Sequence, residues 1–143
     1  MMRLEDVRDL VATTGITDDD RCYMGKMDAK PQKAIGCYSL NRGGSSHHAI
    51  GREKTYGVYP VSILVHWNRS PRETEQAAEE LYSKMDSMSE IEINQKKVQF
   101  VNMLTPHPID VGTDEEGVYE RVIEAEIYYE RSNSNENRSI SSV

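Results

Sequence analysis

The sequence has little cysteine and no long apolar run, and each absence argues against a class of protein. Only two of its 143 residues are cysteine, Cys22 and Cys37, and they form no C-x-x-C motif. We therefore expect two free thiols of a reducing compartment rather than a disulfide framework. The longest apolar run, around residues 63–65, is far shorter than the roughly 20 residues that span a bilayer. The amino terminus lacks the apolar segment of a signal peptide, so we expect neither secretion nor membrane insertion.

Basic charge is also scarce. Lysine and arginine number 17 against 24 acidic residues, which gives a formal net charge of −7. Proteins that bind phosphate backbones usually carry a basic surface, so affinity for nucleic acid is disfavoured.

Motifs of catalysis and cofactor binding are missing as well. There is no G-x-S-x-G, no glycine-rich phosphate loop, and neither cysteine has a histidine at a family spacing. The histidines show no recognised metal-ligand spacing, and we expect His66 to be a half-exposed strand residue. The histidines are His47, His48, His66 and His107. The sequence predicts no enzyme, no cofactor and no metal.

What is present is clearest between residues 56 and 88. Residues 56–67 are rich in β-branched and aromatic side chains, which predicts a strand. Ser70, Pro71 and Glu73 then form a helix start signal, in which serine and glutamate cap free amides reciprocally. The apolar positions that follow have the spacing of one helix face. They are Thr74, Ala77, Ala78, Leu81, Met85 and Met88.

The flanking segments predict one more helix and two hairpins. Residues 3–14 form a short amphipathic helix, and residues 21–27 and 33–40 read as a hairpin around a Lys30-Pro31 turn. A second hairpin joins residues 90–93 to 97–104 and places Val98 and Phe100 on one face. Residues 105–108 break the ladder because Pro106 and Pro108 remove backbone donors.

The last strand, residues 118–131, alternates between an apolar and an acidic side. Ile123 and Ile127 lie on the apolar side, while glutamates occupy the other. The strand is over twice the usual five or six residues long, so we expect it to outrun its own sheet and pair with something else.

The order of elements predicts an α+β, sandwich-like fold. We expect a mainly antiparallel sheet of about four to six strands with two helices packed on one face. Residues 1–131 should form a single α/β domain, and residues 132–143 a flexible tail rich in serine and asparagine.

One charge pattern stands out between residues 110 and 130. It sets eight acidic residues against the single basic Arg121, and it lacks the ligand spacing of a calcium loop. Two interpretations explain this pattern equally well. The acidic residues keep the protein soluble, or they form a surface that repels the phosphates of passing DNA. The acidic residues are Asp110, Asp114, Glu115, Glu116, Glu120, Glu124, Glu126 and Glu130.

Several short segments resemble the minor capsid proteins of long-tailed phages of Gram-positive hosts, a group similar to tail terminator proteins. The resemblance covers nearly the whole chain from Leu4 to Glu130. The segments that carry it are Tyr23-Met24-Gly25-Lys26, Ile35-Gly36-Cys37-Tyr38, Tyr56-Gly57-Val58, Leu64-Val65-His66-Trp67-Asn68 with Ser70-Pro71, and Pro108-Ile109-Asp110-Val111-Gly112-Thr113-Asp114.

The resemblance implies a structural virion protein of the neck, made in the host bacterial cytoplasm. It implies a homohexameric ring that caps the tail tube, contacts a tail tube protein and a head connector protein, and lets genomic DNA pass without specific binding. A head completion or head-closure protein is the alternative. A small cytosolic enzyme that uses the acidic loop with His107 is a third hypothesis.

Three groups of residues are candidates for these contacts. The long last strand could pair subunits through Tyr119, Arg121, Ile127 and Tyr129. Its acidic side could line a DNA channel through Glu120, Glu124 and Glu126. Docking loops could use Arg42, His47, His48, Arg52, Asp110, Asp114 and Glu115.

Overall fold

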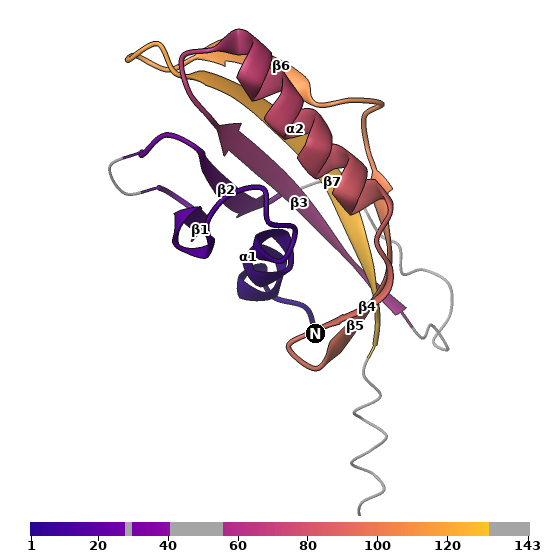
Figure 1. Cartoon of the computed structure of the whole chain (residues 1–143). Coiled ribbons are helices and arrows are strands. Elements are labelled where there is room, and N and C mark those ends of the chain that lie inside the picture. Colours follow the sequence, from indigo (N-terminus) through magenta and orange to yellow (C-terminus); the bar gives the residue numbers. More distant parts are fainter. Residues whose placement is uncertain (28–29, 41–55, 132–143) are drawn as a thin grey trace, which may run out of the picture.

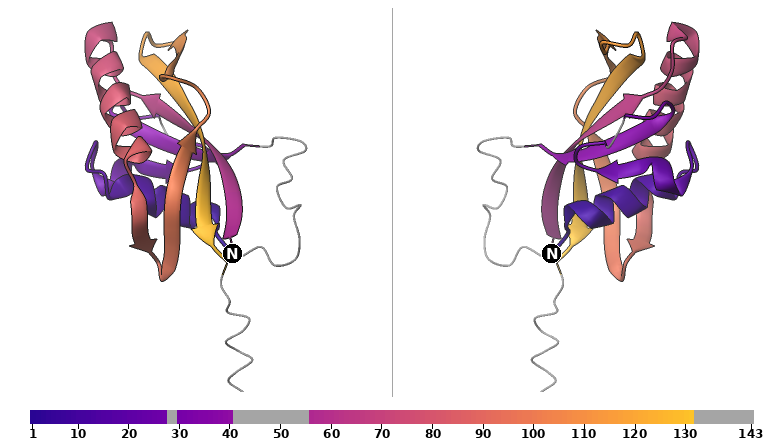
Figure 2. Two further views of the ribbon diagram at one scale, coloured as in Figure 1. Left: turned by 90° about the vertical axis from the view of Figure 1, so that its right-hand side faces the viewer. Right: turned by 90° about the vertical axis from the view of Figure 1, so that its left-hand side faces the viewer.

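Among the residues described by the computed structural model, two α-helices lie on one side of a seven-stranded sheet (Figures 1 and 2). The structure describes residues 1–27, 30–40 and 56–131. In chain order the elements are α1 (Leu4–Ala12), a short 3-10 helix (Asp19–Arg21), β1 (Cys22–Met24), β2 (Ala34–Ser39), β3 (Tyr56–His66), α2 (Pro71–Asp86), β4 (Ser89–Ile93), β5 (Lys96–Met103), β6 (Ile109–Thr113) and β7 (Tyr119–Glu130). The predicted α+β class is confirmed, with more strands than expected.

The strands follow the order β1-β2-β3-β7-β5-β4, and β6 also pairs with β7. Every pair is antiparallel except β1 with β2, which is parallel. The expected hairpin over residues 21–40 is therefore wrong. A tight turn joins only antiparallel strands, so the chain after Met24 must return before β2 begins. Gly25, at φ 82°, starts this return, and its N–H donates to the carbonyl of Cys37 at 2.8 Å.

The long strand β7 is central in the sheet and does not outrun it. One edge pairs with β3 from Glu120 to Glu130. The other edge pairs with β6 near Val122 and with β5 near Ile127. Two strands placed end to end thus match one long strand, and the expected surplus does not exist. Strand β6 was not predicted from the sequence, because prolines precede it and Gly112 lies within it.

The core lies between the helices and one face of the sheet. Helix α2 packs on β3, β5 and β7, whereas α1 packs on β1, β2 and β4. Ile123 and Ile127 of β7 are fully buried, as the alternation predicted. Cys22 and Cys37 are free and buried. Burial raises the pKa of Cys37 to about 12, which makes its thiol unreactive at neutral pH.

Strand β5 contains an irregularity that separates two residues expected on one face. The register shifts between Val98 and Phe100, as at a β-bulge. Val98 is therefore fully buried, while Phe100 is 42% exposed on the opposite face. There its ring centroid lies 4.4 Å from that of Tyr128, which in turn lies 5.7 Å from Tyr56.

The start of α2 fixes the chain just after β3. Ser70 Oγ accepts a hydrogen bond from the N–H of Glu73 at 3.1 Å, as the capping signal predicted. The return bond differs, because Glu73 accepts from the side chain of Asn68, whose own oxygen accepts from the N–H of Ser70. The turn between His66 and α2 is thereby closed by three linked side chains.

Candidate functional site

The face of the sheet opposite the helices carries the polar residues of β3 and β7. Ser62 pairs with Glu124, and His66 pairs with Glu120. Because Ile63 and Ile123 point into the core, alternation places these neighbours on the helix-free face. At the His66 end this face is covered by the turn between β6 and β7.

His66 is fully buried on this face, so the expected half-exposed histidine is wrong. Its Nδ1 lies 2.9 Å from Oε2 of Glu120. An ionised carboxylate only accepts hydrogen bonds, so Nδ1 carries the proton. Its Nε2 has no hydrogen-bond partner among the described residues. The nearest charged group to Nε2 is Oδ2 of Asp114, at 3.8 Å.

Asp114 is held in place by the turn that it closes. Its Oδ1 accepts from the N–H of Glu116 at 2.8 Å and from the N–H of Val118 at 3.0 Å. The hydrogen bond from the Val118 amide is the largest cause of the lowered pKa of Asp114; burial opposes it, and the hydrogen bond from the Glu116 amide lowers the pKa further. Asp114 is thus an ionised carboxylate with one oxygen fixed by the backbone and the other directed at His66.

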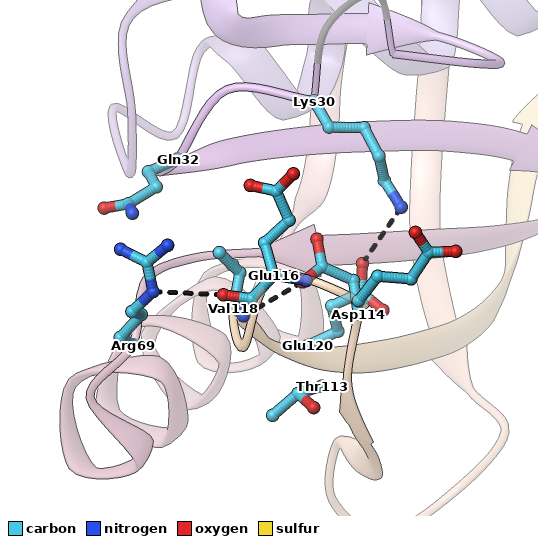
Figure 3. Close-up of a pocket in the computed structure, with 9 residues that line it drawn as sticks. Lys30, Gln32, Arg69, Thr113, Asp114, Glu116, Val118 and Glu120 are labelled. Atoms are coloured by element: carbon cyan, nitrogen blue, oxygen red, sulfur yellow. Dashed lines mark hydrogen bonds and ion pairs between the residues drawn. The ribbon is translucent and has the colours of Figure 1, made fainter.

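A cavity of about 690 Å³ lies beside the carboxylates of Asp114 and Glu120 (Figure 3). Lys30 Nζ lies 3.8 Å from Oε2 of Glu120, and Arg69 Nε donates to the carbonyl of Glu116 at 3.0 Å. The lining residues are Lys30, Gln32, Arg69, Thr113, Asp114, Glu115, Glu116, Val118 and Glu120. Carboxylates outnumber cations in this lining, so the cavity favours a positively charged occupant.

The residues expected to pair subunits through β7 lie on the helix side of the sheet. Ile127 is fully buried, and Tyr129 packs against the core. Arg121 lies 3.7 Å from Asp110 within the same chain, and Tyr119 donates its backbone N–H to the carbonyl of Asn68. With both edges of β7 occupied, the rationale for strand pairing with a second subunit through these residues is removed.

The acidic residues of β7 lie on the helix-free face, but they are not equivalent. Glu120 is engaged by His66, and its side chain is only 13% exposed. Glu126 accepts from the amide of Asn102 at 3.2 Å. Glu124 is partly exposed. A surface that contacts solvent therefore rests on Glu124 and Glu126 more than on Glu120.

The residues expected in docking loops divide into two sets. Arg42, His47, His48 and Arg52 lie outside the described residues. In the other set the side chain of Asp110 is 62% exposed, and both Glu115 and Asp114 line the cavity. Asp114 also closes the turn between β6 and β7.

The enzyme hypothesis joined the acidic loop to His107. The histidine that faces this loop is His66, whereas His107 is exposed and its Nδ1 donates to the carbonyl of Pro108 at 3.0 Å. The burial of His66 could not be predicted from the sequence, because no nearby residue indicates that a turn nearly fifty residues later covers this side chain.

Comparison with known proteins places the chain in a family. A family model described as bacteriophage tail terminator protein matches residues 5–131, which include α2, all seven strands and most of α1. No curated protein matches the chain. In the part of the chain that the structure describes, no helix is long and apolar enough to cross a membrane.

Proposed function

Because the chain belongs to the family of bacteriophage tail terminator proteins, we propose that it closes the finished tail tube as a homohexameric ring in the virion neck. The family is structural, and its members are components of the virion. The observation that carries the proposal is the family match over the entire described sheet.

One side of the ring contacts the tail tube protein, and the other contacts a head connector protein. Genomic DNA passes through the lumen without specific binding. The acidic helix-free face supports this part of the proposal, because Glu124 and Glu126 would repel phosphates and let a duplex slide. Attraction between the channel surface and DNA would slow the passage of the duplex, so an acidic surface suits a channel better than a basic one.

The subunit contact uses the outer strands of the sheet rather than β7. Within the described residues, β1 pairs only with β2 and β4 pairs only with β5, so each has one unpaired edge. Open strand edges are ready to pair with another chain. A contact between two different surfaces, repeated around an axis, closes a ring.

Removing the gene from the phage tests the role. Loss of a terminator should leave overlong tails and unjoined heads in electron micrographs, and supplying the intact gene should restore virions. Tails of normal length beside unjoined heads would instead identify a head-closure protein, the second candidate.

Native mass spectrometry and image averaging of the purified protein test the ring. We expect a hexamer that dissociates on dilution. A chain that stays monomeric at high concentration, with no ring on purified tails, would overturn the terminator proposal.

A further inference from the structure

Nε2 of His66 is a buried polar atom that lacks a hydrogen-bond partner in the described part of the chain. Buried polar groups in native proteins are nearly always hydrogen-bonded, so an unpartnered nitrogen of this kind calls for an explanation. With Nδ1 directed at Glu120, Nε2 is the ring nitrogen that faces the carboxylate of Asp114. Two electron-rich atoms that face each other at 3.8 Å favour a cation between them.

We propose that His66 Nε2 and Asp114 bind one divalent transition-metal ion of the zinc type. One ligand atom from each of His66, Asp114 and Glu120 lies within 4.8 Å of the others. Two ligands of one tetrahedral zinc ion, each at about 2.1 Å, lie about 3.4 Å apart, close to the observed separation. Imidazole nitrogen with carboxylate oxygen is a donor set that zinc accepts.

Glu120 has the role of a positioning residue rather than a ligand. Its hydrogen bond to Nδ1 fixes the tautomer that leaves Nε2 free, which is the arrangement found behind metal-binding histidines. Asp114 is equally constrained, because the Val118 and Glu116 amides hold its other oxygen. Both ligands are thus oriented before an ion arrives.

The cavity gives access to the site from the side of Asp114, whereas His66 lies behind the two carboxylates and does not line it. It reaches Asp114 and Glu120, and its volume admits water for the open coordination positions. Lys30 is the competing cation, but its side chain is 51% exposed and can turn to solvent. The ion would tie the end of β3 to the turn between β6 and β7.

Calorimetric titration of zinc chloride into the untagged, chelator-treated full chain tests the proposal. We expect one ion per chain, with affinity reduced at least about tenfold by Asp114→Asn. Asparagine keeps an oxygen acceptor for the turn amides, so this variant should fold. Glu116→Gln changes a carboxylate of the same cavity that is neither a proposed ligand nor the partner of Nδ1, so this variant should bind zinc like the unchanged protein. The double variant His47→Ser, His48→Ser should do so too.

Two further measurements test what occupies Nε2 of His66 and whether Lys30 competes with the ion. Nitrogen NMR of the His66 ring should show Nε2 shifted by added zinc, and Lys30→Met should tighten zinc binding. An absence of zinc binding would overturn the proposal. So would binding that Asp114→Asn leaves unchanged, or that the His47, His48 variant abolishes. A ring protonated at both nitrogens with zinc present would assign the orphan atom to a proton instead.

Discussion

Asp6 Oδ2 accepts a hydrogen bond from Lys96 Nζ at 2.6 Å, although ninety residues separate the two along the chain. Asp6 is 1% exposed, and its other oxygen accepts from the amide of Asn94 at 2.8 Å. It also caps α1 by accepting from the N–H of Arg3. One carboxylate therefore starts the first helix and fastens it to the turn between β4 and β5.

Asp6→Asn should lower the free energy of unfolding by about 1–3 kcal/mol, because it removes the charge from a buried hydrogen-bonded acceptor. Urea denaturation at pH 7 measures this. Glu5→Gln, at an exposed position in the same helical turn, is the matched control and should change stability little. Equal effects of the two variants would show that the Lys96 contact adds nothing.

The same carboxylate predicts a loss of stability in acid. Burial raises the pKa of Asp6, but the hydrogen bonds from Lys96, Asn94 and the Arg3 amide together lower it below its ordinary value of 3.8. A pKa lowered by folding stabilises the protein above the unfolded-state pKa, and that stability is lost as the pH falls through the folded value. Urea midpoints should therefore decrease below about pH 4, and less steeply in Asp6→Asn.

The Ser70 cap predicts a smaller effect. Ser70→Ala should cost about 1 kcal/mol because the Glu73 amide loses its acceptor. Ser83→Ala, at an exposed position within α2, should instead be neutral or slightly stabilising, since alanine favours helices. Thermal unfolding of both variants gives the comparison, and a Ser70→Ala protein as stable as Ser83→Ala would contradict the capping role.

Neighbouring residues of β7 test the assignment of its two faces. Ile123→Ala should cost about 2–5 kcal/mol because Ile123 is fully buried. Val122→Ala, on the partly exposed face, should cost clearly less. Ile123→Asp should prevent folding, since it buries an unpaired charge. Soluble, folded Ile123→Asp protein would show that the inward face is wrongly assigned.

Charge reversal tests the proposed channel surface. Glu124→Lys with Glu126→Lys should slow DNA ejection or reduce retention of packaged DNA, because lysines attract phosphates. Glu79→Lys with Glu80→Lys makes the same change of charge on the exposed surface of α2 and should leave infectivity intact. Equal infectivity of both double variants would mean that the helix-free face does not line the lumen.

The helices and most strands could be predicted from sequence, because their signals are local. Ser70-Pro71 and the apolar spacing of α2 depend on neighbours within one or two turns. The alternation of β7 likewise placed Ile123 inward and Glu124 outward.

Long-range pairing could not be predicted in the same way. The parallel pairing of β1 with β2 and the central position of β7 depend on partners that no local pattern identifies. Burial of His66 and of Asp6 depends on segments about fifty and ninety residues away. The site at His66 was missed for this reason, since its carboxylates are ordinary surface residues until the fold brings them to an imidazole.

The place of β7 bears on how the protein is synthesised. Of the strands that the structure describes, it is the last to leave the ribosome, yet β3, β5 and β6 all pair with it. A nascent chain that has not reached residue 119 therefore holds three strands with open edges and cannot complete its core. Chains that end before that point lack the strand that joins β3 to β5 and β6, so we expect them to be unable to form the complete sheet from which subunit contacts are made.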